Sequence, residues 1–88
     1  MFTVKTKDGE LKVKFHHQTV GDNRGTDCRI HNDDYSIDVV GHALCHPNDN
    51  FDRRVGRKIA LTHVLQLFTE DRDVRKMFWK EYLKTNRV

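Results

Sequence analysis

The stretch CHPNDNFDRRVGRKIAL, residues 45–61, decides the fold because the pattern of apolar residues changes within it. Before it, apolar and polar residues alternate as in strands, and after it apolar residues recur at helical spacing. It contains the only proline, Pro47, followed by Asn50 and Asp52, which are good helix-capping residues. We therefore expect a β-rich part over residues 1–46 and a helical part over residues 50–84.

The same stretch places several cations at the start of the expected helix. The first amide groups of a helix lack intrahelical partners and carry a partial positive charge, so this end suits anions. Arginine forks match phosphate geometry, and Gly56 leaves room for a ligand beside the backbone. We expect a phosphate-binding site formed by Arg53, Arg54, Arg57 and Lys58, with His46 and Asn48 at its rim. The alternative is a solvated basic face of the helix.

Upstream, the pattern predicts an antiparallel meander of four strands. Asp8-Gly9 between two alternating runs is typical of a hairpin with a type I′ turn. Residues 19–25 have the composition of a loop. The third strand is expected over residues 26–31 and the fourth from Tyr35 to about Cys45, with Gly41 marking a bulge or bend. The residues expected on the buried face of the hairpin are Phe2, Val4, Leu11, Val13 and Phe15, followed by Cys28 and Ile30 in the third strand.

Downstream, the spacing predicts two helices, the second running from about Asp71 to Lys84 with Val74, Phe78 and Tyr82 on one face. The apolar face expected for the first helix comprises Val55, Ile59, Leu61, Val64, Leu65, Leu67 and Phe68. The predicted fold is α+β, with the order ββββαα, in a single domain over residues 1–88.

Composition narrows the functional classes. The net charge of +3 is uneven, because residues 1–50 carry six Lys/Arg against eight Asp/Glu, whereas residues 51–88 carry ten against five. A basic second half suits phosphate-bearing partners. The apolar runs are too short for a membrane span, and the first residues do not resemble a signal peptide, so we expect no membrane association. A chain of 88 residues buries a modest core, which favours a homodimer or a larger symmetric oligomer.

Two Cys-His pairs raise the possibility of zinc. Cys28 and His31, and His42 and Cys45, have the spacing of ligand pairs in small zinc sites. On strands, however, residues three apart point to opposite faces, so we expect Cys28 to be a buried core thiol and no metal to be bound. Glycine-rich phosphate loops and the motifs of serine hydrolases are absent from the sequence. We expect a protein that is not an enzyme and needs no cofactor.

The pattern Gly41-x-Ala43-x-Cys45-His46-Pro47-x-Asp49-x-Phe51-Asp52, followed by residues 56–61 (GRKIAL), resembles one found in small bacteriophage proteins. The resemblance extends over residues 26–82 and includes the TDCRI strand at 26–30 and the WKEY end at 79–82. The layout of strands followed by two helices is also similar to the anti-Thoeris sponge proteins of phages, which sequester cyclic ADP-ribose-type signals. No ligand-binding residue is carried over from them.

The resemblance implies a phage accessory protein that acts in the cytoplasm of the bacterial host. Together with the cationic helix start, it leads us to expect an anti-defence protein that sequesters a cyclic or ADP-ribose-type signalling nucleotide without cleaving it. Two other classes stay open. One is an interaction protein that inhibits a host defence protein, and the other is a weak nucleic-acid-binding module.

Overall fold

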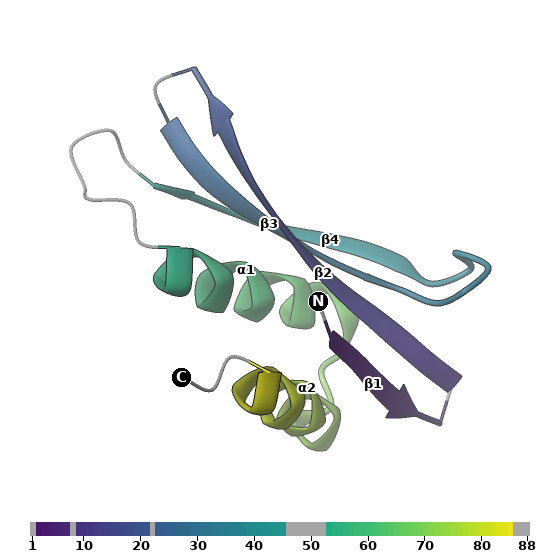
Figure 1. Ribbon diagram of the computed structural model, residues 1–88. Helices are drawn as coiled ribbons and strands as arrows, with labels where there is room; N and C mark the ends of the chain where they lie inside the picture. The colour runs from purple at the N-terminus through teal and green to yellow at the C-terminus, as the bar shows by residue number, and fades with distance from the viewer. Residues whose placement is uncertain (1, 8, 22, 46–52, 86–88) are drawn as a thin grey trace.

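The computed structural model describes residues 2–7, 9–21, 23–45 and 53–85. Within these residues the chain forms four strands followed by two helices. The elements are β1 (Phe2–Thr6), β2 (Gly9–Val20), β3 (Asn23–His31), β4 (Asp38–Cys45), α1 (Arg53–Phe68) and α2 (Arg72–Thr85). The strands form one antiparallel sheet in the order β1-β2-β3-β4. Both helices lie on the same side of this sheet (Figure 1). The predicted α+β fold, a meander followed by two helices, is confirmed.

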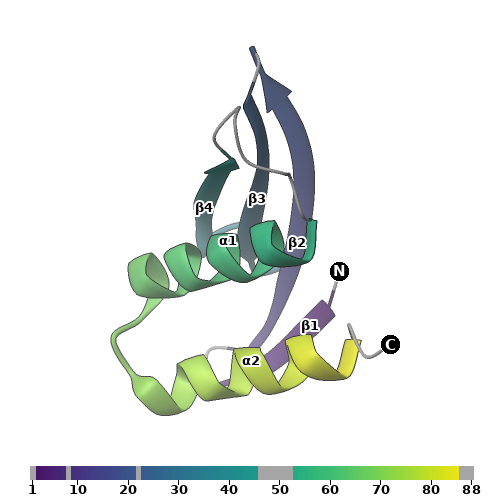
Figure 2. The same ribbon diagram turned by 90° about the vertical axis from the view of Figure 1, so that its left-hand side faces the viewer.

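The two helices divide the sheet between them. Helix α1 packs on β3 and β4, and α2 packs on β1 (Figure 2). We call the side of the sheet that carries the helices the covered face and the other side the open face. Side chains alternate between these two faces along every strand, so the covered face collects every second residue.

The β1–β2 hairpin follows the predicted alternation. Phe2, Val4, Leu11 and Val13 are buried on the covered face, and Phe15 is partly buried against the same core. The turn differs by one residue from the prediction, because Gly9 pairs with Thr6 and so belongs to β2. Gly9 has a φ of 101°, a conformation that glycine adopts without steric cost.

The predicted loop over residues 19–25 is wrong. β2 continues to Val20 and β3 already begins at Asn23, so that Thr19 pairs with Arg24 and Gln18 with Gly25. Gly21, with a φ of 61°, lies in the tight connection between the two strands. Gly25 pairs within the ladder instead of forming a turn, and an added Cβ there would lie 2.8 Å from a methyl group of Leu44.

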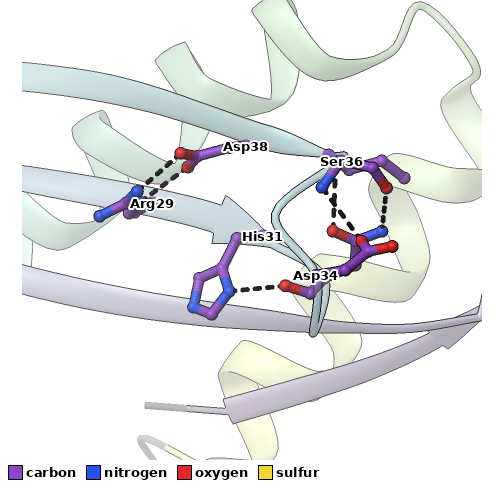
Figure 3. Close-up of polar contacts among 7 residues, drawn as sticks. Arg29, His31, Asp34, Ser36 and Asp38 are labelled. Atoms are coloured by element: carbon purple, nitrogen blue, oxygen red, sulfur yellow. Dashed lines mark hydrogen bonds and ion pairs between the residues drawn. The ribbon is translucent and has the colours of Figure 1, made fainter.

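The fourth strand begins three residues later than predicted, at Asp38. Residues 32–37 form a turn in which the Asn32 side chain donates to Ser36 Oγ (2.7 Å) and accepts from the Ile37 amide (3.0 Å) (Figure 3). Tyr35 has a φ of 58° and leaves the strand direction, and its ring stacks on that of His31. Beyond the turn, Arg29 donates two hydrogen bonds to the Asp38 carboxylate (2.6 and 2.7 Å) on the open face.

Gly41 marks no bulge, which corrects the sequence interpretation. The pairing of β4 with β3 runs without interruption through Gly41 and Cys28. The glycine instead lets α1 approach the sheet, because an added Cβ would lie 2.4 Å from the backbone nitrogen of Val64. The close approach is therefore between the two backbones, with no side chain between them.

The buried face of α1 is also rotated from the one predicted. The buried residues are Gly56, Ala60, Leu61, Val64 and Leu65, and Phe68 packs partly against the core. Three residues of the predicted face, Val55, Ile59 and Leu67, are 50%, 42% and 68% exposed. The backbone of α1 lies close to the sheet, and the small residues Gly56 and Ala60 are on the buried side of the helix. In α2, Phe78 and Tyr82 are buried as predicted, and Val74 is partly buried.

We predict that Gly41→Ala destabilises the protein by about 1–3 kcal/mol, because the new methyl group would collide with the α1 backbone. Chemical denaturation monitored by circular dichroism measures this change. Val40→Ala is the matched control, since Val40 neighbours Gly41 but lies on the open face, and its effect should be within about 0.5 kcal/mol. Equal stability of the Gly41→Ala variant and the parent protein would contradict the described approach of α1.

Candidate anion-binding site

Polar residues replace apolar ones toward the end of the covered face that lies beneath the start of α1. Along β2, the covered-face residues Leu11, Val13 and Phe15 are followed by His17 and Thr19 in the same phase. On β3, Thr26 pairs with His17 and Arg24 pairs with Thr19, so these two residues share the same face. The hydrophobic core therefore ends at Phe15, and the sheet continues beyond it with a polar surface.

Helix α1 adds two arginines to this surface. Arg57 precedes the buried Ala60 by three residues and the buried Leu61 by four, so it shares their side of the helix. Arg53 lies one turn earlier on the same side. Arg53 lines a groove of about 350 Å³, and the other described residues that line it are His17, Gln18, Thr19 and Arg24. We call this feature the basic groove, since two of its described lining residues are arginines and none is acidic.

The pKa of His17 reflects the positive charge of the basic groove. Its Nδ1 lies 2.8 Å from Thr26 Oγ1, whose residue is fully buried. Burial lowers the pKa of His17, and the positive charges of Arg53 and Arg57 lower it further, with a smaller contribution from His16. The lowered pKa favours the neutral imidazole, and most of the positive potential that it experiences comes from Arg53 and Arg57 of α1.

Arg57 carries an unmet hydrogen-bonding requirement. Its Nε is shielded from solvent and has no acceptor among the described residues. Leaving a buried donor without an acceptor costs about 1–3 kcal/mol, and more for a charged group. An anion that reached this nitrogen would recover part of that cost. Phosphate and carboxylate oxygens are the acceptors that guanidinium groups bind best.

The structure separates the six predicted site residues. Arg53 lines the basic groove and Arg57 is close enough to His17 to lower its pKa. Arg54 and Lys58 are exposed and are not among the residues that line the groove. His46 and Asn48 lie outside the described residues.

Two important groove residues, Arg24 and His17, were missed from the sequence. Arg24 was assigned to a loop, although it has the same phase as Cys28 and Ile30 on β3. Extending that alternation backwards by four residues would have placed it on the covered face. His17 likewise continues the alternation of Val13 and Phe15 on β2, which would have placed it on the covered face.

The Cys-His pairs do not form a common site among the described atoms. Cys28 is fully buried on the covered face, whereas His31 and His42 lie on the open face. His42 Nδ1 contacts Asp27 Oδ1 at 2.6 Å, and His31 Nδ1 lies 3.0 Å from the Asn32 carbonyl oxygen. The Cys45 side chain lies outside the described atoms. Within the described part of the chain, no three His, Cys, Asp or Glu residues are grouped as metal ligands.

Comparison with protein-family models, with curated proteins and with solved structures finds no match to this chain. Neither α1 nor α2, the helices of the described ranges, combines the length and apolar character that a membrane-spanning helix needs.

We predict that the pKa of His17 lies below its ordinary value and rises in Arg53→Gln, because that change removes a nearby positive charge. NMR titration of the imidazole protons measures both values, with His17→Asn identifying the resonance. Because the unfolded chain takes up this proton at higher pH than the folded chain, His17 should lower folding stability as pH falls below about 6.5. Arg72→Gln, at the start of α2, is the charge-matched control, and an equal shift there would show an effect of net charge alone.

We also predict that the Cys28 thiol is unreactive in the folded protein. Burial raises its pKa to about 12, so almost no thiolate forms at pH 8. In a Cys45→Ser background, an aromatic disulfide reagent should label Cys28 only at the rate at which the protein unfolds. Rapid labelling without denaturant would mean that Cys28 does not lie in the core.

Proposed function

We propose that this protein binds a phosphate-bearing nucleotide in the basic groove and holds it without cleaving it. The observation that carries the proposal is the set of guanidinium groups at one end of the covered face. Arg24 and Arg53 line one groove that has no acidic residue among its described lining. Arg57 adds a buried Nε that lacks an acceptor. Like charges held together in this way repel one another, and a bound polyanion relieves that repulsion.

Binding without cleavage is supported by the properties of the described lining. General acid–base catalysis of phosphate-ester hydrolysis uses groups that donate or accept protons near neutral pH. His17 is the only described lining residue that titrates in that range, and its lowered pKa makes it a weakly populated acid at pH 7. Its Nδ1 is also engaged with Thr26. No second acid or base accompanies His17 among the described lining residues, and this favours recognition by hydrogen bonds over acid–base catalysis.

The class of ligand follows from the resemblance to phage proteins over residues 26–82. A phage protein that sequesters a nucleotide would act on a signal of the host defence. We therefore propose a cyclic or ADP-ribose-type signalling nucleotide as the ligand, with its phosphates at Arg24, Arg53 and Arg57. The groove volume of about 350 Å³ is at the lower end of small-molecule sites, so it would hold the phosphates and part of a nucleoside.

The test is calorimetric titration with cyclic ADP-ribose, ADP-ribose, cyclic dinucleotides and inorganic pyrophosphate. We expect a nucleotide to bind and the Arg24→Ala, Arg53→Ala and Arg57→Ala variants each to lose ten- to a hundredfold in affinity, which is about 1.5–3 kcal/mol per charge-assisted contact. Arg72→Ala removes the same charge from α2 and should bind like the parent protein. Recovery of intact nucleotide after incubation distinguishes sequestration from cleavage.

Two results would contradict the proposal. In the first, none of these ligands binds. In the second, Arg72→Ala loses as much affinity as Arg53→Ala, so that net charge and not the groove is responsible. Binding of a fluorescent single-stranded oligonucleotide is measured in parallel. If it binds more tightly than every nucleotide, with a steep dependence on salt, the protein is a nucleic-acid-binding module instead.

A further inference from the structure

The free edge of β1 lies beside a second groove, far along the sheet from the basic groove. Among the described strands, β1 is an end strand that pairs with β2 alone. Helix α2 packs next to it, and both views show α2 running alongside β1 (Figures 1 and 2). An unpaired strand edge is a template on which another chain can add as a strand.

The hydrogen-bond pattern shows which backbone groups of β1 face outward. The Asn32 amide donates to the Ile37 carbonyl (3.1 Å), so the backbone of Asn32 points from β3 toward β4. Successive residues of a strand point their amides to alternate sides, and hydrogen-bonded pairs alternate with non-bonded ones. The registers of β3 with β2 and of β2 with β1 are unbroken, so this alternation can be followed to β1. In β1 the amide and carbonyl groups of Thr3 and Lys5 are directed away from β2.

Two adjoining hollows extend along this edge. One, of about 330 Å³, is lined by Thr3, Val4, Lys5, Met77, Lys80 and Glu81. The other, of about 610 Å³, shares Lys5 and Met77 with it and reaches the connection between α1 and α2. Its apolar lining includes Phe68, Val74 and Met77, of which Met77 is 40% exposed. Outward-facing amides therefore border two adjoining hollows with apolar side chains on the side of α2.

Charge identifies the occupant that fits this edge. Lys5 is exposed on the open face, where Glu10 of β2 is its cross-strand neighbour on the inner side, and the exposed Lys7 follows directly after β1. If a second copy added its own β1 in the antiparallel register centred on Val4, the two Lys5 side chains would become diagonal neighbours on one face, which is unfavourable. A strand with acidic side chains on that face would instead be complementary. On the α2 side, Asp71 and Asp73 also line the groove and disfavour acidic side chains there.

We propose that the free edge of β1 accepts an extended segment of a partner protein as a fifth strand. The segment alternates apolar side chains, which pack on Val74 and Met77, with acidic side chains, which lie beside Lys5 and Lys7. Main-chain hydrogen bonds to Thr3 and Lys5 hold it, and the alternating side chains determine specificity, as in other cases of strand addition. This site is independent of nucleotide binding, because none of its residues lines the basic groove.

The test uses two synthetic eight-residue peptides with blocked ends, one alternating valine and glutamate and the other valine and lysine. Calorimetry should show that the glutamate peptide binds about tenfold more tightly than the lysine peptide, from two cross-strand charge pairs. Hydrogen exchange followed by NMR should show protection of the Thr3 and Lys5 amides when the glutamate peptide is bound. A side-chain-only interaction would not protect these amides.

Three variants complete the experiment. The double change Lys5→Glu and Lys7→Glu should reverse the preference between the two peptides, whereas Lys14→Glu, which lies on the open face of β2, should leave it unchanged. Lys5→Pro removes an outward amide without taking a hydrogen bond from the β1–β2 pair, and it should abolish protection of Thr3. The proposal is overturned if neither peptide binds at millimolar concentration, or if the double change does not reverse the preference. It is also overturned if light scattering shows a dimer that Lys5→Pro dissociates, since the edge would then pair with a second copy.

Discussion

The packing of α1 directly on the backbone of β4 is the contact on which the rest of the structure depends. Gly41 has no side chain, and Val64 lies where that side chain would be. This approach determines which side of α1 is buried, and that side carries the small residues Gly56 and Ala60 together with Leu61, Val64 and Leu65. It also determines the position of the first turn of α1, which lies next to the polar residues at the end of β2 and the start of β3.

The basic groove results from a change of character along one face of one strand. β2 keeps its alternation over twelve residues, but its covered-face residues are apolar only as far as Phe15. Because β2 extends beyond the hydrophobic core, its last covered-face side chains are polar and lie near a helix. Polar groups that are partly buried in this way need hydrogen-bond partners. His17 forms a hydrogen bond with Thr26, whereas Arg57 Nε has no acceptor among the described residues. Burial contributes to both features, because it is the largest cause of the lowered pKa of His17 and it shields Arg57 Nε from solvent.

The two candidate sites use different chemistry at different ends of the molecule. The basic groove presents side-chain cations from α1 and β3, and its selectivity would come from charge and from hydrogen-bond geometry. The edge of β1 presents backbone groups and an apolar surface on α2, and its selectivity would come from alternation. The layout of the fold permits both, because α1 packs on β3 and β4 whereas α2 packs on β1, and the basic groove lies at the opposite end of β2 from its first residues.

The sequence by itself determined the features that depend on near neighbours. Alternation around Gly9 is enough to predict the first hairpin and its buried residues, and the spacing of Phe78 and Tyr82 is enough to predict the buried side of α2. The order of elements follows from the change of period between residues 45 and 61. The same local reasoning failed at Gly25 and Gly41, since a glycine in a strand can mark either a turn or a close approach, and only the partner that approaches distinguishes the two.

Tertiary structure alone decided which side of α1 is buried and which residues form the basic groove. Val55, Ile59 and Leu67 are as apolar as the residues that replace them in the core, so hydrophobicity could not indicate that the sheet would contact Gly56 and Ala60. Arg24 and Arg53 are far apart in the chain, and they line one groove because β3 and α1 meet at the same end of the covered face. The period of a helix or strand is a property of residues a few positions apart. The meeting of two such elements depends on the face that each buries, and that is a property of the whole packed chain.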